Sequence, residues 1–359
     1  MSTRPTRCLI IFIAVFTASI SLLPLVNVSR SGFTKNPFNI DVALAWISQR
    51  MVRVGISIHP GQVIVGLNGW LHLGDDYGQT LSDDRRPPDR EDEALAAKIK
   101  LAADAWRRTL RIYGVREYLV MVGPNKGAVY SETMPKWARA TKESSIDALL
   151  ANPGPDYLDL RPALLSTKSN TPAALYYSTD THWNMLGAAA AFRAFSDRVG
   201  RDQAFVKWPG HEAYRVSGMA MRQGGDLARF LYLDHDVTDP DPKLGVENWP
   251  TTVVQRDWRT GKTLSTGSNL QIQTPSVPVL VESSGALNHV RVLWLRDSFG
   301  VALSPFMAAT FSDVLQIHWR DGFADGALLK LVERFKPDYV FVTVVQRDAR
   351  SQPFATPPD

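Results

Sequence analysis

Apolar and polar positions alternate in blocks along the last third of the chain. Short runs of consecutive apolar residues are typical of strands buried on both faces, and longer stretches with an apolar residue every three or four positions indicate helices. The predicted strands are 290–295, 314–319 and 339–345, and the predicted helices between them are about 301–309 and 327–335. Strands that alternate with helices predict an α/β fold with a mostly parallel sheet covered on both faces.

The first half of the chain shows the same pattern. An apolar stripe with helical spacing predicts a helix over 91–113 that ends at Gly114, and a buried strand over 118–122 follows. A shorter strand is predicted over 157–160 and an alanine-rich helix over 184–199. In a parallel sheet, reactive groups collect beyond the carboxyl ends of the strands, so the loops there are the places to search for a site.

A hairpin is predicted ahead of these elements. The apolar runs Val63–Leu67 and Trp70–Leu73 are joined by Asn68-Gly69. Asn-Gly is a strong signal for a tight turn because both turn positions require positive φ. The segment predicts two short antiparallel strands.

The pattern divides the chain into regions. We expect a single α/β domain over 61–350, in which the less regular, Gly/Pro-rich stretch 201–285 forms an insertion or a small β element. Residues 31–60 are predicted to be a linker that includes a short amphipathic helix, and residues 351–359 a tail.

The N-terminal residues 1–30 have the features of an export signal. Arg4 and Arg7 precede an apolar run from Cys8 to Val26. At about 1.5 Å per residue, a helix of this length just spans a hydrocarbon core of about 30 Å. We predict an uncleaved signal anchor that holds the protein to the inner membrane with its body in the periplasm or outside the cytoplasm. Cleavage of a signal peptide followed by secretion is the alternative.

Composition adds a few limits. The chain has 359 residues and a net charge of +4 at pH 7, without a dense run of Lys or Arg. This charge is too small to indicate nucleic-acid binding, although it is compatible with an acidic polymer as substrate. The single cysteine, Cys8, lies in the N-terminal apolar run, so the folded part contains no disulfide.

A serine follows the first of the C-terminal strands. The strand over 290–295 ends in Arg296-Asp297-Ser298-Phe299-Gly300, and a helix is predicted immediately afterwards. A serine at a strand-to-helix turn holds its hydroxyl above the sheet, where N–H groups of the helix can stabilise an oxyanion. Ser298 is therefore a candidate nucleophile. The alternative is that it only caps the following helix.

A candidate base lies in the segment 177–184. Asp180 and His182 are separated by one residue, so both side chains can reach one site from the same loop. A histidine oriented by a carboxylate is what a serine nucleophile requires for deprotonation. An Asp-x-His pair is also compatible with a metal site. The other histidines are scattered singly, so we predict no metal and no cofactor; they are His59, His72, His211, His235, His289 and His318.

Taken together, these segments resemble the alginate O-acetyltransferase family, the AlgJ/AlgX-like proteins with an SGNH-hydrolase-type domain. The resemblance is carried by the hairpin with Gly69-Trp70-Leu71, the loop with Asp180-Thr181-His182-Trp183 and the turn with Asp297-Ser298-Phe299. The segments 124–130 and 336–340 are also similar to the family's pattern. The resemblance covers about residues 60–350. Arg296 departs from the pattern, because a glycine usually precedes Asp-Ser.

The resemblance implies a fold, a mechanism and partners. It implies an SGNH-hydrolase-like sheet with a permuted order of catalytic blocks, since Asp180 and His182 precede Ser298. Ser298 is expected to carry an acetyl group, His182 to act as base and then acid, and Asp180 to orient the imidazole. The expected acceptor is an exported, alginate-like exopolysaccharide, and the expected acetyl donor is a multi-pass membrane-bound O-acyltransferase. Because the chain ends soon after 345, the expected type is the membrane-anchored one without a carbohydrate-binding module.

Five further residues are weaker candidates for substrate binding or oxyanion stabilisation. They are Asn125, Lys126, Asp226, Arg320 and Arg347. Most follow predicted strands, and turn formation or an ordinary surface position explains them equally well.

Other functions are compatible with the same residues. An acetylesterase uses the same triad with water as acceptor, and the sequence does not separate the two because they differ in acceptor binding and water exclusion. A non-catalytic scaffold subunit of a polysaccharide export complex is an alternative from a different class. A metallohydrolase is a further one.

Overall fold

The computed structural model describes residue 17 and residues 40–358. The predicted signal segment 1–30 lies outside the described residues apart from residue 17, so its anchoring role stays a prediction. In the described part of the chain, no helix is both long and apolar enough to cross a membrane.

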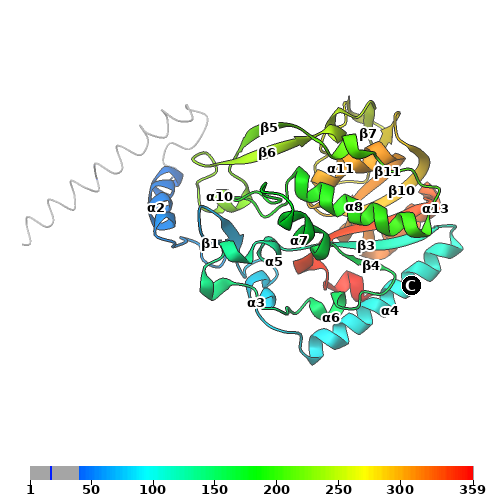
Figure 1. Cartoon of the computed structure of the whole chain (residues 1–359). Coiled ribbons are helices and arrows are strands. Elements are labelled where there is room, and N and C mark those ends of the chain that lie inside the picture. The colour runs from blue at the N-terminus through cyan, green and yellow to red at the C-terminus, as the bar shows by residue number, and fades with distance from the viewer. Residues whose placement is uncertain (1–16, 18–39, 359) are drawn as a thin grey trace, which may run out of the picture.

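The core of the molecule is an eight-stranded mixed sheet flanked by helices (Figure 1). The strand order is β4-β3-β12-β10-β11-β9-β7-β8. The first five strands in this order are parallel to one another, and the last three are antiparallel. They are β3 (Glu117–Gly123), β4 (Tyr157–Asp159), β7 (Val253–Asp257), β8 (Thr263–Gly267), β9 (Val279–Ser283), β10 (Asn288–Arg296), β11 (Phe311–His318) and β12 (Tyr339–Val345).

Helices cover both faces of this sheet, as the alternating pattern predicted. Successive strand residues point to opposite faces, so neighbours such as Leu119 and Val120 belong to different halves of the core. One face packs against α7 (Arg161–Ser169), α8 (Met185–Asp202) and α11 (Gly300–Thr310). The other packs against α4 (Arg90–Ile112), α12 (Trp319–Phe323) and α13 (Ala327–Phe335). The α/β class is confirmed.

The longest helix, α4, shows why the local predictions succeed. The Asp89 carboxylate accepts hydrogen bonds from the N–H groups of the first turn, and the Asp92 carboxylate accepts one from the Asp89 N–H, which forms a capping box. Its last residues are followed by Gly114 at φ +87°, a conformation that suits glycine. The predicted hairpin is also present as β1 (Val63–Val65) and β2 (Leu71–Leu73), with Asn68 at φ 55° and Gly69 at φ 82°.

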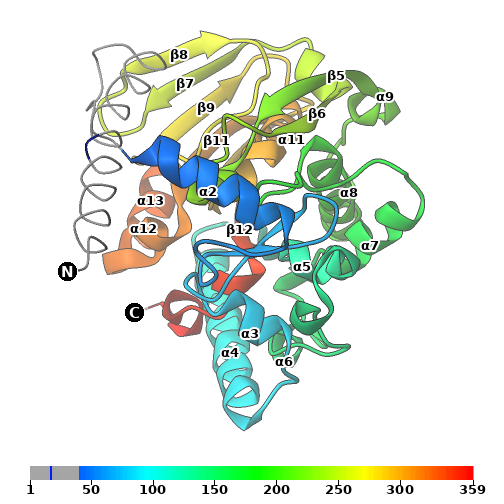
Figure 2. The same ribbon diagram turned by 90° about the vertical axis from the view of Figure 1, so that its left-hand side faces the viewer.

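Residues 201–285 form the β structure that was expected, but they are not set apart from the domain. Strands β7, β8 and β9 extend the main sheet beyond β11. Only β5 (Val216–Gln223) and β6 (Thr238–Leu244) form a separate antiparallel ribbon, which lies above the ends of the parallel strands (Figure 2). The segment therefore completes both the sheet and, as shown below, the site.

Apart from α2, the remaining described helices and 3-10 turns are one or two turns long. They are α2 (Asp41–Arg53), α3 (Thr80–Asp84), α5 (Lys126–Val129), α6 (Asp147–Leu150), α9 (His211–Tyr214), α10 (Asp226–Phe230), η2 (Ser131–Thr133), η3 (Lys136–Ala138), η4 (Gly245–Asn248), η5 (Ala324–Gly326), η6 (Gln346–Asp348) and η7 (Gln352–Ala355). The C-terminal segment predicted as a tail is packed, because Phe354 is buried and Trp106 Nε1 donates to the Thr356 carbonyl at 2.9 Å.

Candidate active site

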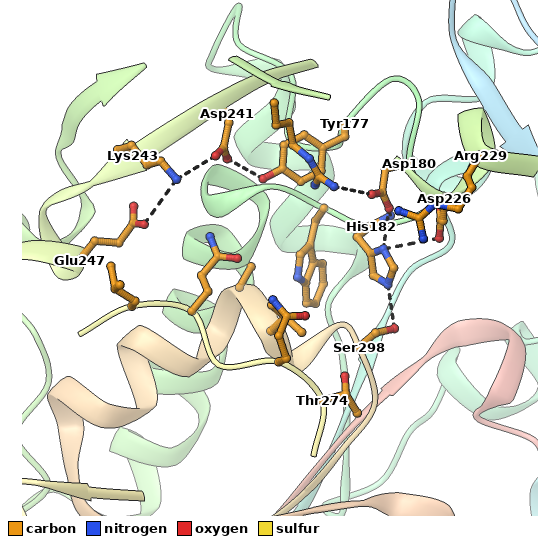
Figure 3. Close-up of a pocket in the computed structure, with 17 residues that line it drawn as sticks. Tyr177, Asp180, His182, Asp226, Arg229, Asp241, Lys243, Glu247, Thr274 and Ser298 are labelled. Atoms are coloured by element: carbon orange, nitrogen blue, oxygen red, sulfur yellow. Dashed lines mark hydrogen bonds and ion pairs between the residues drawn. The ribbon is translucent and has the colours of Figure 1, made fainter. Parts of the chain in front are cut away.

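The site lies at the carboxyl ends of the parallel strands, where the fold predicts reactive groups to collect. Ser298 stands in the turn between β10 and α11, and the loop with Asp180 and His182 approaches it from before α8 (Figure 3). The three predicted triad side chains meet in one hydrogen-bonded chain, although Ser298 lies 116 residues after His182 in sequence. His182 Nε2 lies 2.7 Å from Ser298 Oγ, and His182 Nδ1 lies 2.6 Å from Asp180 Oδ1.

The serine turn is fixed by its neighbour Asp297. The Asp297 carboxylate accepts hydrogen bonds from the N–H groups of Phe299 (2.8 Å) and Val345 (2.7 Å), which join the turn to the end of β12. Burial raises the pKa of Asp297, although these backbone donors act against the shift. The N-cap residue of α11 is Phe299, and Ser298 instead bonds to His182, so the simple capping alternative does not describe this serine.

The pKa values of the Asp180–His182 pair move apart. Burial alone would lower the pKa of His182, but the hydrogen bond and charge of Asp180 outweigh it and the net shift is upward. For Asp180, burial is again opposed by His182 and by Arg222, and the net shift is downward. Asp180 therefore stays ionised while it orients the imidazole and stabilises its protonated form.

A buried lysine holds the loop over residues 177–184, here called the catalytic loop, on the side away from the cleft. Lys126 Nζ donates to the carbonyl oxygens of Tyr177 (3.0 Å), Ser178 (3.0 Å) and Asp180 (2.7 Å). Burial lowers the Lys126 pKa to about 8 despite three nearby carboxylates. All three hydrogens of the ammonium group have acceptors in the loop.

The residue before it, Asn125, donates to the buried Asp84 at 3.1 Å. Neither Asn125 nor Lys126 lines the cleft that contains Ser298. Their contact with substrate stays a prediction, and their side chains lie behind the loop rather than in the cleft.

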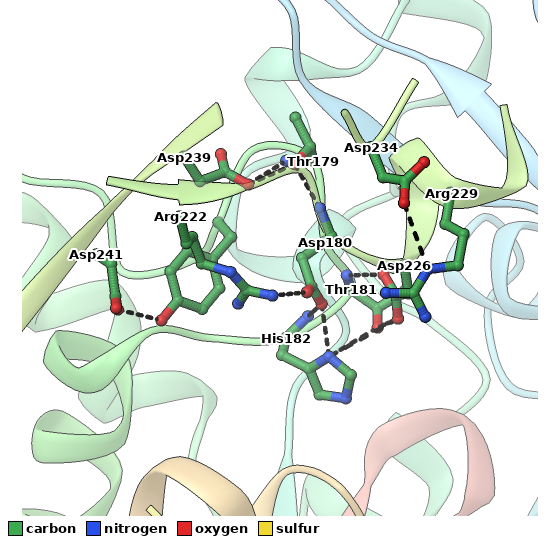
Figure 4. Close-up of polar contacts among 12 residues, drawn as sticks. Thr179, Asp180, Thr181, His182, Arg222, Asp226, Arg229, Asp234, Asp239 and Asp241 are labelled. Atoms are coloured by element: carbon green, nitrogen blue, oxygen red, sulfur yellow. Dashed lines mark hydrogen bonds and ion pairs between the residues drawn. The ribbon is translucent and has the colours of Figure 1, made fainter. Parts of the chain in front are cut away.

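Three side chains from the segment 201–285 hold the same loop from outside (Figure 4). Arg222 donates to Asp180 Oδ2 at 3.1 Å. Asp226 accepts from the Thr181 N–H at 2.7 Å, and its Oδ2 lies 3.7 Å from His182 Nδ1. Asp239 accepts from the N–H groups of residues 178 and 179 at 2.8 and 3.2 Å. Of the weaker candidates, Asp226 is the one that lines the cleft.

Gly225 permits this close packing. A Cβ on Gly225 would lie 2.2 Å from the Asp180 Cβ, so a side chain there would displace the carboxylate. Its N–H donates to Thr179 Oγ1 at 3.0 Å. Only a glycine allows the backbone to approach the catalytic carboxylate this closely.

Asp180, His182 and Asp226 could also hold a metal ion, since each offers a ligand atom and these atoms lie within 4.8 Å of one another. However, the imidazole nitrogen that faces the carboxylates is already hydrogen-bonded to Asp180. The Arg222 guanidinium occupies the other Asp180 oxygen with a positive charge. The hydrogen-bonding pattern therefore favours a triad over a metal centre.

Ser298 opens onto a cleft of about 530 Å³. One wall is the segment 270–274, which is tied to the nucleophile's strand through Arg296. This arginine is fully buried, and its Nη2 donates to the carbonyls of Ile272 (2.8 Å) and Gln273 (2.9 Å). Its Nε donates to Gln316 on β11, and burial lowers its pKa to about 9. Arg296, which stands where the family pattern usually has a glycine, thus connects the turn with Ser298 to the cleft wall.

The two other arginine candidates do not reach the cleft. Arg320 is exposed on α12, where it lies 3.3 Å from Asp348 and stacks on Trp319. Arg347 lines a small cavity behind the catalytic loop, together with Asn125 and Lys126. Their substrate contacts stay predictions, and neither side chain lines the cleft, because a position just past a strand end does not decide on which side of the loop a side chain lies. Arg347 still affects the site, since its charge lowers the pKa of His182.

Sequence reasoning missed several residues that shape the site. Asp297 had a detectable signal, because an Asp before a turn commonly accepts backbone N–H groups. Arg222 and Asp239 had none, since each is linked to the catalytic loop only through tertiary contacts with a ribbon of weak periodicity.

Comparisons with known proteins place this fold and site in a family. A family model described as the SGNH hydrolase-like domain of the acetyltransferase AlgX matches residues 63–273, which is more than half of the chain. The match includes Asp180 and His182 and ends before Ser298.

A curated relative from Pseudomonas aeruginosa, named probable alginate O-acetylase AlgJ, is 28% identical over 184 residues. The matched segment covers 49% of this chain and 42% of that protein. A Pseudomonas putida protein of the same name is 27% identical over 177 residues, with 49% of this chain and 43% of that protein covered. The chain therefore spans less than half the length of the curated relatives it matches.

Among solved structures, Bacillus cereus PatB1 is similar with a TM-score of 0.57 and 16% identity, over 81% of this chain and 98% of that one. A DHHW family protein from Eubacterium siraeum has a TM-score of 0.52 and 18% identity, over 81% and 96% of the two chains. These likenesses support the fold. The match over residues 63–273 shows that the chain belongs to the AlgJ/AlgX-like family of SGNH hydrolase-like acetyltransferase domains.

Proposed function

We propose that this protein is a serine-dependent O-acetyltransferase that carries an acetyl group on Ser298 and transfers it to a hydroxyl of an exported polysaccharide. The observation that carries the proposal is the continuous chain from Ser298 Oγ through His182 to Asp180, with separations of 2.7 and 2.6 Å. Hydrogen-bond reach between nucleophile, base and orienting carboxylate is the requirement for this chemistry.

In the first half of the reaction, His182 Nε2 takes the proton of Ser298 Oγ as the oxygen attacks the donor's acetyl carbon. The bond from that carbon to the donor's leaving group breaks, and His182 returns the proton to the leaving group. In the second half, His182 takes the proton of a sugar hydroxyl, which attacks the acetyl-serine. The Ser298 oxygen leaves and recovers its proton.

The developing oxyanion requires hydrogen-bond donors near Ser298. Among the described residues, no acceptor is bonded to the Ser298 N–H, and this group lies at the start of α11. A free backbone N–H at a helix start is suited to stabilise an oxyanion. Asp297 supports it by accepting from the N–H of Phe299, the residue after the serine, and from Val345 at the end of β12.

The compartment and partners of this reaction belong to the same proposal. The basic and apolar N-terminal sequence supports a location outside the cytoplasm, anchored to the inner membrane or secreted after cleavage. The family resemblance supports a multi-pass membrane-bound O-acyltransferase as the source of acetyl groups. The curated relatives are named probable alginate O-acetylases, and these names support an exported polysaccharide as the acceptor class.

The test uses the purified full-length chain in detergent with a chromogenic acetyl ester, with and without candidate oligosaccharides. We expect ester turnover, an acetylated Ser298 peptide after rapid quenching, and acetylated sugar detected by mass spectrometry. An acetylesterase would release only acetate in the presence of every sugar. A scaffold would show neither ester turnover nor labelling of Ser298, and that outcome would contradict the proposal.

A further inference from the structure

The charges in the cleft beside Ser298 are unusual for a site that receives an acidic polymer. Three cationic side chains line the cleft, and four carboxylates line it with them. The cations are Arg222, Arg229 and Lys243, and the carboxylates are Asp180, Asp226, Asp241 and Glu247. Because basic residues do not outnumber acidic ones, the cleft as a whole does not attract anions.

Two of the three cations are already engaged by carboxylates. Arg222 donates to Asp180 at 3.1 Å and stacks over the Tyr177 ring at 4.3 Å. Lys243 lies 2.8 Å from Asp241 and 3.8 Å from Glu247. Figure 3 shows this lysine with its two acidic partners at the side of the cleft away from Ser298. An anionic sugar that entered there would have to compete with both carboxylates.

The third cation stands at the rim. The Arg229 side chain is 73% exposed, and its Nε lies 3.8 Å from Asp234. Its charge is screened by solvent and by this neighbour, so it is a weak attachment point for a carboxylate. It marks the place where an acidic sugar would bind if the cleft accepted one.

The remaining polar groups of the cleft are uncharged. Gln271, Gln273 and Thr274 lie along the wall opposite the ribbon and can both donate and accept hydrogen bonds. Such groups suit sugar hydroxyls, while Asp241 and Glu247 can accept from hydroxyls but repel a carboxylate. The chemistry of the wall is that of a site for a neutral sugar.

We propose that the acceptor bound in this cleft is an uncharged, hydroxyl-rich sugar unit rather than a uronate. The inference rests on the proposed function, whose acceptor class came from family resemblance and from the names of relatives. A polyuronate carries one carboxylate on every residue, and those of the sugar units in the cleft would lie near Asp226, Asp241 and Glu247. Like charges placed together at an interface disfavour the wrong partner strongly.

The experiment compares two acceptors that differ only at C6: a β-1,4-linked mannuronate hexamer and β-1,4-linked mannohexaose. The two share backbone and stereochemistry, and the carboxylate of one is a hydroxymethyl group in the other. The purified full-length protein is supplied with a chromogenic acetyl ester, and acetylated sugar is measured by mass. We expect mannohexaose to be acetylated with a kcat/KM roughly tenfold or more above that of the mannuronate.

Charge variants sharpen the comparison. In Asp241→Asn/Glu247→Gln, Lys243 loses its charged partners. The ratio of kcat/KM for mannohexaose to kcat/KM for mannuronate should then fall by roughly tenfold. The matched control is Glu333→Gln, an exposed carboxylate on α13 away from the cleft, which should leave the ratio unchanged.

The inference would be overturned if the protein acetylated mannuronate in preference to mannohexaose and Arg229→Gln abolished that preference. It would also be overturned if the protein did not acetylate mannohexaose. Ester turnover without any sugar separates the two proposals. If turnover is normal, only the acceptor inference has failed. If turnover is absent, the proposed function has failed.

Discussion

The two halves of the catalytic site are held in place in different ways. The turn with Ser298 is fixed by Asp297, which bonds to its own turn and to the neighbouring strand β12. The loop with Asp180 and His182 is fixed by Lys126 from below and by Asp226 and others from outside. The sheet thus places the nucleophile, while side chains that are distant in sequence place the base. Changes to the distant contacts should therefore affect the base without disturbing the nucleophile.

Removing the nucleophile should have the largest effect. Ser298→Ala deletes one oxygen, so we expect ester turnover to fall by roughly 10⁴-fold or more with no change in melting temperature. Ser217→Ala is the matched control, because Ser217 is exposed on β5. Initial rates and thermal melts measure the two quantities. Turnover within tenfold of the parent would show that the nucleophile is elsewhere.

Replacing the orienting carboxylate of Asp180 should have the second-largest effect on turnover, and it should also shift the pH dependence of turnover. His182 must be neutral to accept the serine proton, and Asp180 raises its pKa, so turnover should fall as pH drops through a value above about 6.5. In Asp180→Asn the main raising influence is lost, and this acidic limb should shift to lower pH. We expect kcat to fall by roughly 10²- to 10⁴-fold.

The control for this change is Asp236→Asn, an exposed carboxylate that does not line the cleft. Rates between pH 5 and pH 9 measure both effects. An unchanged acidic limb in Asp180→Asn would mean that the titration belongs to another group.

Removing the buried lysine tests the loop alone. Lys126→Met leaves three carbonyl oxygens without their donor, which should lower the free energy of unfolding by about 1–3 kcal/mol. Because the loop carries His182, we expect kcat to fall by roughly tenfold to a hundredfold while acetylation of Ser298 by a reactive ester still occurs. Lys98→Met on the exposed side of α4 is the control. Denaturant melts and quench-labelling measure the outcome, and unaltered kcat would contradict the bracing role.

The smallest effect is expected at Arg320. This residue was a candidate from its position after β11, but its exposed side chain pairs with Asp348 outside the cleft. Arg320→Ala should change kcat/KM for ester and for sugar by less than about twofold, and stability by less than about 0.5 kcal/mol. A large loss of sugar acetylation alone would reveal a second sugar-binding surface on α12.

Much of the fold was predictable because the signals are local. The apolar run in β12 and the capping box of α4 each lie within one short segment, and Asn68-Gly69 alone determines a turn type. The edge strands were not predictable. All five residues of β8 are exposed, so it has no apolar alternation, and it is a strand only because β7 provides hydrogen-bond partners.

The site shows the same limit. Asp180, His182 and Ser298 were found because the chemistry demands those residue types, and the structure brings them together. Lys126 was expected to line the cleft, but it bonds to the catalytic loop from the other side. The sequence does not say on which side of the loop a side chain at a strand end lies. Arg222 could not be predicted, because only the tertiary structure brings it to Asp180, 42 residues away in sequence.

The cleft wall over 270–274 has a consequence for how acceptor preference can diverge among related enzymes. Its backbone is anchored by Arg296 at two carbonyls and by Ser304 Oγ, which accepts from the Ile272 N–H at 2.8 Å. The side chains of Gln271, Gln273 and Thr274 are not needed for that anchoring. They can be exchanged at little cost to the fold, so under the proposed function the preferred sugar can change while the turn with Ser298 keeps its geometry.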